Sequence, residues 1–79
     1  MYYYTKLKII KLLKRLRQDR KLTQSQVAIS LGITKAYISQ IEAGKVGIPR
    51  HRFMIRLLEV YSIKPKYFEA LLKDKNESI

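Results

Sequence analysis

The stretch LTQSQVAISLGITKAYISQIEA, residues 22–43, decides the fold of this chain. Thr23 is followed three places later by Gln26, the spacing of a capping box, in which each side chain satisfies a free backbone donor at a helix start. Thr34 begins a second helical pattern, and Gly32 stands before it, where the first helix must end and the backbone needs a positive φ. The stretch therefore predicts two short helices joined by a tight turn.

These two helices are expected over about residues 24–31 and 35–43. Apolar residues recur on one face of each helix, and we expect the core to contain Val27, Ala28, Leu31, Ile38 and Ile41. The outer face of the second helix carries small, polar or cationic side chains together with one tyrosine, namely Lys35, Ala36, Tyr37, Ser39 and Gln40. Two helices joined by so short a turn form a helix-turn-helix.

Three more helices are expected around this pair. Thr5 can cap a first helix that runs to about Arg20, with an apolar face of Ile9, Leu12, Leu13 and Leu16. Pro49 and Pro65 stand near the starts of a fourth and a fifth helix, where proline is tolerated. Because no strand pattern or internal repeat appears, we expect an all-α fold, a compact five-helix bundle forming one domain over residues 1–79.

The charge of the chain is strongly asymmetric. Residues 1–56 carry 13 Lys and Arg against two acidic residues, whereas residues 57–79 carry four of each, so the net charge of +11 lies around the helix-turn-helix. A polyanion is the natural partner for such a field. Most of these cations individually are still best read as a solvated surface.

Catalytic and metal-binding signatures are missing. The 79 residues include no Cys and a single His, His51, and no glycine-rich phosphate loop or paired carboxylates appear. We therefore expect neither an enzyme, nor a metal or cofactor site, nor a small-molecule ligand. No span is apolar enough for a membrane helix, and lysines interrupt the early apolar residues too often for a signal peptide, so we expect a cytoplasmic protein.

The joint spacing of these residues resembles the lambda-repressor-like, Cro-type helix-turn-helix family, also called the XRE family. The resemblance covers roughly residues 7–72 and rests on Arg17, Thr23, Gln24, Val27, Ala28, Leu31, Gly32, Ile33, Thr34, Ile38, Ser39, Ile41, Glu42, Gly44 and Pro49. It implies a DNA-binding transcriptional regulator with its helix-turn-helix at about residues 24–43. It also implies a buried ion pair between Arg17 and Glu42.

The resemblance further implies which residues meet double-stranded DNA. In this family the second helix of the motif enters the major groove, which would place four side chains at base edges, those of Lys35, Ala36, Ser39 and Gln40. Contacts to the DNA backbone would come from Gln24, Thr34, Tyr37, Lys45, Arg50 and Arg52. For Tyr37 two alternatives to a backbone contact stay open, namely contact with a base methyl group and packing on the first helix of the motif. The basic residues at 50–52 depart from the family, which often has a capping Ser or Thr there.

Family members of this size generally bind as symmetric dimers through their last helices. That implies a dimerisation region at about residues 57–73, for which the candidates are Tyr61, Tyr67, Phe68 and Leu71. Each of these residues can equally be ordinary core. A dimer would read a pseudo-palindromic operator, with recognition helices about 34 Å apart.

Several functions stay open within and outside the family. Controller proteins of restriction–modification systems, phage Cro-like repressors and antitoxins share this pattern, so RNA polymerase or a cognate toxin remains a candidate further partner. A protein-binding antitoxin with secondary DNA binding is the main alternative. A membrane-surface module built on the basic amphipathic residues 5–21 is weaker, because it leaves residues 22–72 unexplained.

Overall fold

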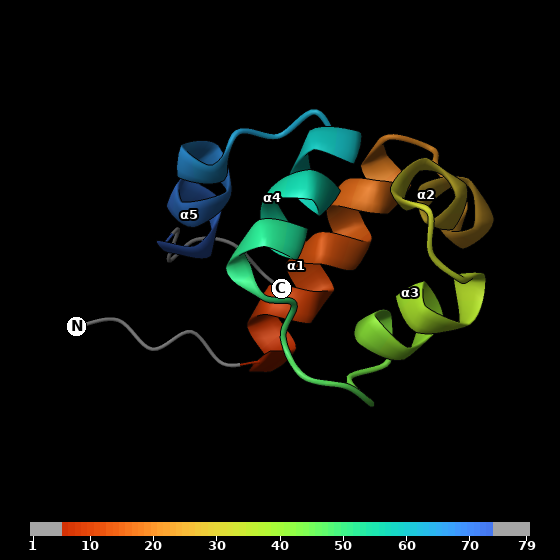
Figure 1. The fold of residues 1–79 in the computed structure, drawn as a ribbon. Coiled ribbons are helices and arrows are strands. Elements are labelled where there is room, and N and C mark those ends of the chain that lie inside the picture. The colour runs from red at the N-terminus through yellow and green to blue at the C-terminus, as the bar shows by residue number, and fades with distance from the viewer. Residues whose placement is uncertain (1–5, 74–79) are drawn as a thin grey trace.

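The computed structural model describes residues 6–73 of the chain, and in that range it contains five helices and no strand. The helices are α1 (Lys6–Asp19), α2 (Gln24–Leu31), α3 (Lys35–Glu42), α4 (His51–Val60) and α5 (Pro65–Lys73) (Figure 1). The predicted all-α fold with five helices is confirmed. The expected cap at Thr5 lies outside the described residues.

The start signals of α2 and α3 form as the sequence predicts. The Thr23 hydroxyl accepts a hydrogen bond from the Gln26 backbone N–H at 3.0 Å, and the Gln26 side chain accepts one from the Thr23 N–H at 2.8 Å. Gly32 ends α2 with φ +69°, and the Thr34 hydroxyl caps α3 by accepting from the Tyr37 N–H at 3.2 Å. The turn between the helices is therefore held by hydrogen bonds between residues close in sequence.

The core contains the predicted faces of α1, α2 and α3 with one correction. Ile10, not Ile9, is the first fully buried residue of α1, while Ile9 is only partly covered. Leu12, Leu13 and Leu16 are buried as expected. Since the apolar face of α1 packs inside the protein, it is not available to a membrane surface. None of the described helices has the length and apolar character needed to cross a bilayer.

Two residues that the sequence analysis placed at a dimer interface, Tyr61 just after α4 and Phe68 on α5, lie in the core. Tyr61 is 1% exposed and Phe68 is 6% exposed, and both belong to the core cluster of the monomer. Because both side chains are buried within one copy of the chain, they are not available at its surface for a dimer contact, and this prediction is wrong. An amphipathic stripe packs on the nearest apolar surface, which here is the rest of the same chain.

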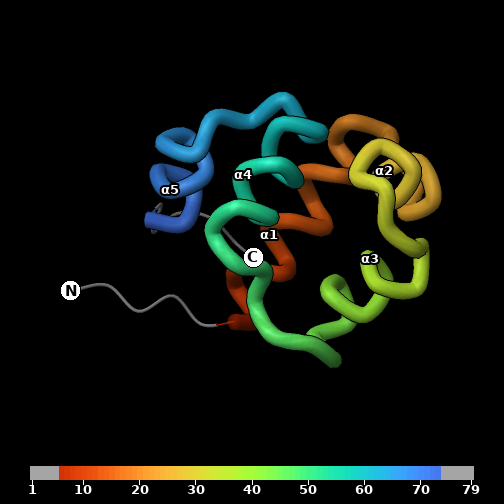
Figure 2. The backbone as a smooth tube through the Cα atoms, viewed as in Figure 1, coloured from red at the N-terminus to blue at the C-terminus, as the bar shows by residue number. Residues whose placement is uncertain are grey.

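Helices α1 and α4 lie in the middle of the molecule, with α2 and α3 on one side and α5 on the other (Figure 1, Figure 2). Two arginines join these elements through backbone carbonyls. The Arg20 Nε donates to the Tyr61 carbonyl, just after α4, at 2.7 Å, and the Arg56 Nη2 donates to the Leu31 carbonyl at the end of α2 at 3.3 Å. A cation at a helix C-terminus satisfies a free carbonyl and matches the helix dipole.

Candidate nucleic-acid interface

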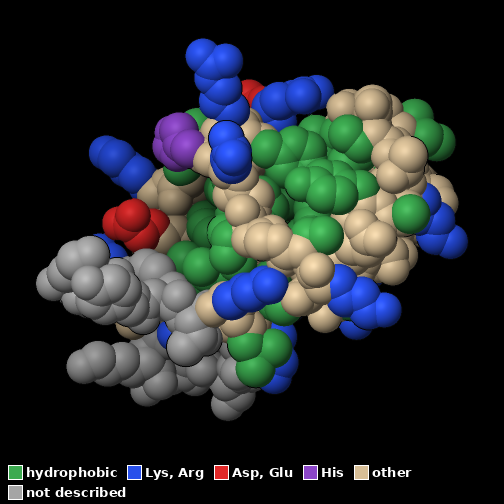
Figure 3. Space-filling view, turned by 60° about the horizontal axis from the view of Figure 1, so that its bottom comes forward, with side chains coloured by type: hydrophobic (Ala, Val, Ile, Leu, Met, Phe, Trp, Pro, Cys, Tyr) green, Lys and Arg blue, Asp and Glu red, His purple; other side chains and the backbone are tan. Residues whose placement is uncertain are grey.

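The outer face of α3 is open to solvent along its length. Ile38 and Ile41 hold the other face in the core at 2% exposure each. The four predicted base-reading residues Lys35, Ala36, Ser39 and Gln40 are all exposed. Figure 3 views the molecule from the side on which α3 and the following loop lie, and Lys and Arg side chains project around a hydrophobic area there.

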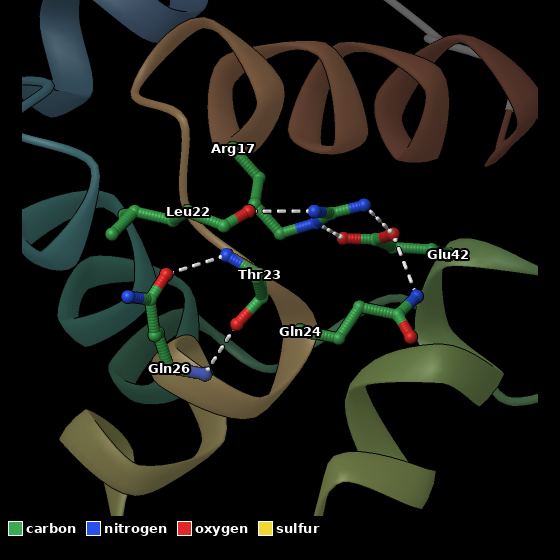
Figure 4. A network of polar contacts seen from close by, with 6 residues as sticks. All are labelled: Arg17, Leu22, Thr23, Gln24, Gln26 and Glu42. Carbon is green, nitrogen blue, oxygen red and sulfur yellow. Dashed lines mark hydrogen bonds and ion pairs between the residues drawn. The ribbon is translucent and has the colours of Figure 1, made fainter.

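The predicted ion pair between Arg17 and Glu42 forms and holds the end of α3 against α1. The Arg17 Nε donates to one carboxylate oxygen of Glu42 at 2.6 Å, and Nη2 donates to the other at 3.0 Å. The two side chains are only 11% and 5% exposed. Hydrogen bonding to Glu42 raises the pKa of Arg17, although burial opposes that shift. Arg17 also donates to the Leu22 carbonyl at 2.7 Å, so one guanidinium joins α1, the loop before α2 and α3 (Figure 4).

Gln24 belongs to this network, which the sequence analysis did not predict. Its Nε2 donates to a carboxylate oxygen of Glu42 at 3.0 Å (Figure 4). An amide nitrogen carries two N–H donors, so one remains for another acceptor. The Glu42 carboxylate therefore holds the side chain of Gln24, which is the first residue of α2.

An open depression of about 500 Å³ lies beside this network, at the start of α2. Its lining combines two lysines, small polar side chains and the first turn of α2, and comprises Arg17, Lys21, Leu22, Thr23, Gln24, Ser25 and Lys35. Free backbone N–H groups at a helix N-terminus favour anions, and the two lysines add positive charge. Sequence reasoning missed Lys21 and Ser25 here. Lys21 adopts φ +56° after α1, and the sequence carries no cap signal that would have placed it.

The loop after α3 and the first turn of α4 carry three more of the predicted contacts to the DNA backbone. Lys45, Arg50 and Arg52 are exposed. Arg50 precedes α4 in an extended conformation and its side chain makes no cap hydrogen bond, so α4 starts without the Ser or Thr that is common in the family. Lys6 donates from Nζ to the Gly44 carbonyl at 3.0 Å and so ties the beginning of this loop to α1. His51 is exposed at the start of α4.

Tyr37 packs on α4, not on α2 as one alternative proposed. Its ring centroid lies 5.8 Å from that of Phe53, with the planes tilted by 57°. The Tyr37 side chain remains partly exposed beside the face of α3 that carries the base-reading candidates. The last two dimer candidates lie on α5, where Tyr67 is exposed and Leu71 is half-buried.

The arrangement defines a helix-turn-helix protein, and comparison with known families agrees. A sequence model described as the helix-turn-helix domain matches residues 11–71. The chain belongs to this family of DNA-binding domains. The match includes all of α2, α3 and α4 and most of α1 and α5.

Two curated relatives come from Bacillus subtilis strain 168. The chain is 43% identical over 51 residues to the HTH-type transcriptional repressor RghR, a match that covers 65% of this chain and 38% of that protein. It is also 43% identical over 51 residues to the uncharacterized HTH-type transcriptional regulator RghRB, covering 65% of this chain and 37% of that protein. The shared region thus spans less than two-fifths of either relative. No solved structure matches the chain.

Proposed function

We propose that this chain is a sequence-specific regulator of transcription that binds double-stranded DNA with α3 in the major groove. The observation that carries the proposal is the outer face of α3, which is polar and exposed while its inner face is buried. The names of the two curated relatives, a transcriptional repressor and a transcriptional regulator, support the same function. The mechanism is occupancy of an operator and needs no chemical step.

Each candidate side chain has a role that its chemistry supports. Lys35 suits the O6 and N7 acceptors of guanine, Gln40 suits adenine, and Ala36 suits the methyl group of thymine, with Ser39 as a further hydrogen-bonding contact. Phosphates would be held at the depression by Gln24 and the first turn of α2, at the start of α3 by Thr34, and beyond α3 by Lys45, Arg50 and Arg52. The exposure of Lys45, Arg50 and Arg52 supports this division, since none of their side chains makes a hydrogen bond or ion pair within residues 6–73.

We further propose that two copies bind together. Helix α5 lies on the opposite side of the molecule from α2 and α3, so pairing through α5 leaves both recognition faces free (Figure 2). With Tyr61 and Phe68 in the core, the surface for pairing reduces to Tyr67 and Leu71 among the four candidates. Such a dimer would read two half-sites about 34–36 Å apart on one face of the duplex.

The experiment that tests this function is selection of bound duplexes from a random pool, followed by affinity measurement on the enriched sequence. We expect an inverted repeat with half-site centres about one helical turn apart. Affinity should fall roughly 10³-fold or more between 50 and 200 mM salt if six or more phosphates are contacted. A pool without an enriched sequence would contradict specific recognition, and an enriched single half-site would contradict the dimer.

A further inference from the structure

We propose that Tyr37, supported by Phe53, is a specificity-determining residue that packs against the methyl group of a thymine in the major groove. This inference rests on the proposed function and adds a base preference to it. It also replaces the phosphate contact that the sequence analysis assigned to Tyr37.

Tyr37 lies on the surface of α3 next to a residue that we assign to a base edge. Tyr37 lies in the first turn of α3, where its backbone N–H is bound by the capping hydroxyl of Thr34. Gln40 follows three places later and is therefore its neighbour on the helix surface. The ring of Tyr37 thus stands beside a residue that we assign to a base edge.

Phe53 packs against the ring of Tyr37. Centroids 5.8 Å apart and planes tilted by 57° fall in the range that aromatic pairs prefer. Tyr37 keeps 37% of its surface exposed, and Phe53 is half-buried, so the two rings together present an apolar surface to solvent. The Tyr37 hydroxyl has no hydrogen-bond partner within residues 6–73.

The chemistry of the major groove identifies the group that this surface fits. Tyr37 lies on α3 between Thr34 and Lys45, and Phe53 follows Arg50 and Arg52, so the two rings lie close in sequence to residues that would hold phosphates. Among the four standard bases, the only apolar group displayed in the major groove is the methyl group of thymine. A phosphate contact would use the Tyr37 hydroxyl alone and would leave the exposed part of the Phe53 ring without an apolar partner.

The test replaces each thymine of the selected site by uracil, which removes only the methyl group. Fluorescence anisotropy titrations with the full chain should show one thymine in each half-site whose replacement weakens binding by roughly four-fold, the effect of burying one methyl group. Replacements at other positions away from Ala36 and Tyr37 should leave the affinity unchanged. A second such position in each half-site is expected from Ala36, which the proposed function also assigns to a thymine methyl group.

Variants assign the effect to the ring. Tyr37→Ala should make the affinities for thymine and uracil equal at one position. Tyr37→Phe should keep the wild-type ratio of the two affinities, even if the variant binds both duplexes more or less tightly. Phe53→Leu should lower the ratio, because it removes the ring that orients Tyr37. Ile29→Ala, which shortens an exposed apolar side chain of α2, is the matched control and should keep the ratio. Circular dichroism of each variant verifies that the helices are retained.

Two results would overturn the inference while leaving the proposed function standing. In the first, the wild-type chain binds its selected site in a salt-dependent way but does not distinguish thymine from uracil anywhere. In the second, Tyr37→Ala keeps the full thymine-to-uracil ratio at every position. If no duplex is enriched at all, the proposed function and this inference fall together.

Discussion

Arg17 and Glu42 form a two-point contact, with Nε 2.6 Å from one carboxylate oxygen and Nη2 3.0 Å from the other. The pair joins the last turn of α1 to the last residue of α3. Because Glu42 also accepts from Gln24 at the start of α2, one carboxylate fixes how the two helices of the motif sit against α1. The angle at which α3 is presented therefore depends on a small buried polar network.

Removal of one partner of this pair should strongly destabilise the fold. Glu42→Leu leaves the Arg17 guanidinium in a site that is only 11% exposed. A buried charge without its partner costs about 3–5 kcal/mol, and we expect a loss of about 3 kcal/mol in the free energy of unfolding, measured by urea denaturation. The double variant Arg17→Met with Glu42→Leu should recover most of that loss.

Asp19→Asn is the matched control for this prediction. It weakens the ion pair between Arg15 and Asp19, whose atoms are 3.9 Å apart and whose side chains are 46% and 54% exposed. An exposed pair of this kind contributes about 0.5 kcal/mol or less. Equal losses for Asp19→Asn and Glu42→Leu would contradict a special role for the buried pair.

Gly44 should tolerate substitution less well than Gly32. Both have positive φ, at +73° and +69°, a conformation that costs an L-residue about 1–2 kcal/mol. A Cβ at Gly44 would also stand 3.1 Å from Cδ1 of Ile10, whereas a Cβ at Gly32 meets nothing within 4 Å. We expect Gly44→Ala to cost about 2 kcal/mol in unfolding free energy and Gly32→Ala about 1 kcal/mol.

The added cost at Gly44 comes from Ile10, and a double variant can show this. Ile10→Val removes Cδ1, so it should cost less in the Gly44→Ala background than in the wild-type chain. Gly47→Ala is the control, since Gly47 has no positive φ and no atom within 4 Å of an added Cβ. Simple additivity of Ile10→Val and Gly44→Ala would show that the close approach has no energetic effect.

Stability should fall at alkaline pH because of Tyr61. Burial raises the pKa of Tyr61 well above its ordinary value, and the charge of Glu42 adds to this, while Arg17 opposes it. The unfolded chain then loses the phenol proton at about pH 10, whereas the folded chain keeps it. The folded state is thus fully favoured below about pH 10 and loses up to about 1.4 kcal/mol per pH unit above it.

Thermal unfolding at pH 8 to 11 measures this dependence. Tyr61→Phe should flatten the alkaline part of the curve, because it removes the proton that distinguishes the two states. Tyr67→Phe removes a tyrosine that is 56% exposed and should keep the wild-type slope. If both variants behave alike, lysine titration and not Tyr61 accounts for the alkaline loss.

Gln24→Ala should affect both stability and DNA binding. Glu42 loses one hydrogen bond, which for a charged acceptor contributes about 1.5–3 kcal/mol, reduced here because Gln24 is itself partly exposed. We expect a loss of about 1 kcal/mol in unfolding free energy and a similar weakening on the selected and on an unrelated duplex. A loss confined to the selected duplex would instead make Gln24 a base-reading residue.

The helix-turn-helix could be predicted from sequence because its signals are local. Thr23, Gln26, Gly32 and Thr34 act on backbone groups within a few residues, and the structure shows each of them doing so. The Arg17–Glu42 pair is separated by 25 residues and came from the resemblance to a family, not from any local pattern.

Other features depend on tertiary contacts that no local signal contains. Tyr61 and Phe68 lie on apolar stripes, and a stripe does not indicate whether it will meet a partner or the same chain. The carbonyl contacts of Arg20 and Arg56 join residues 41 and 25 positions apart, so the sequence left both arginines among the surface cations. Helical periodicity places Ile9 within the stripe of Leu12, Leu13 and Leu16, so periodicity alone did not show that Ile10 is the more deeply buried of the two.

The central claim is that the outer face of α3 reads bases, and Lys35→Ala tests it most directly. Duplex selection from one random pool should be run in parallel with the wild-type chain and with Lys35→Ala, under the same salt concentration. We predict that both recover the same repeated site, with the preference relaxed at one base pair of each half-site and affinity for the wild-type site reduced by about 1–3 kcal/mol. Equal weakening on every sequence, with an unchanged base preference, would show that Lys35 touches only phosphate and would contradict the account.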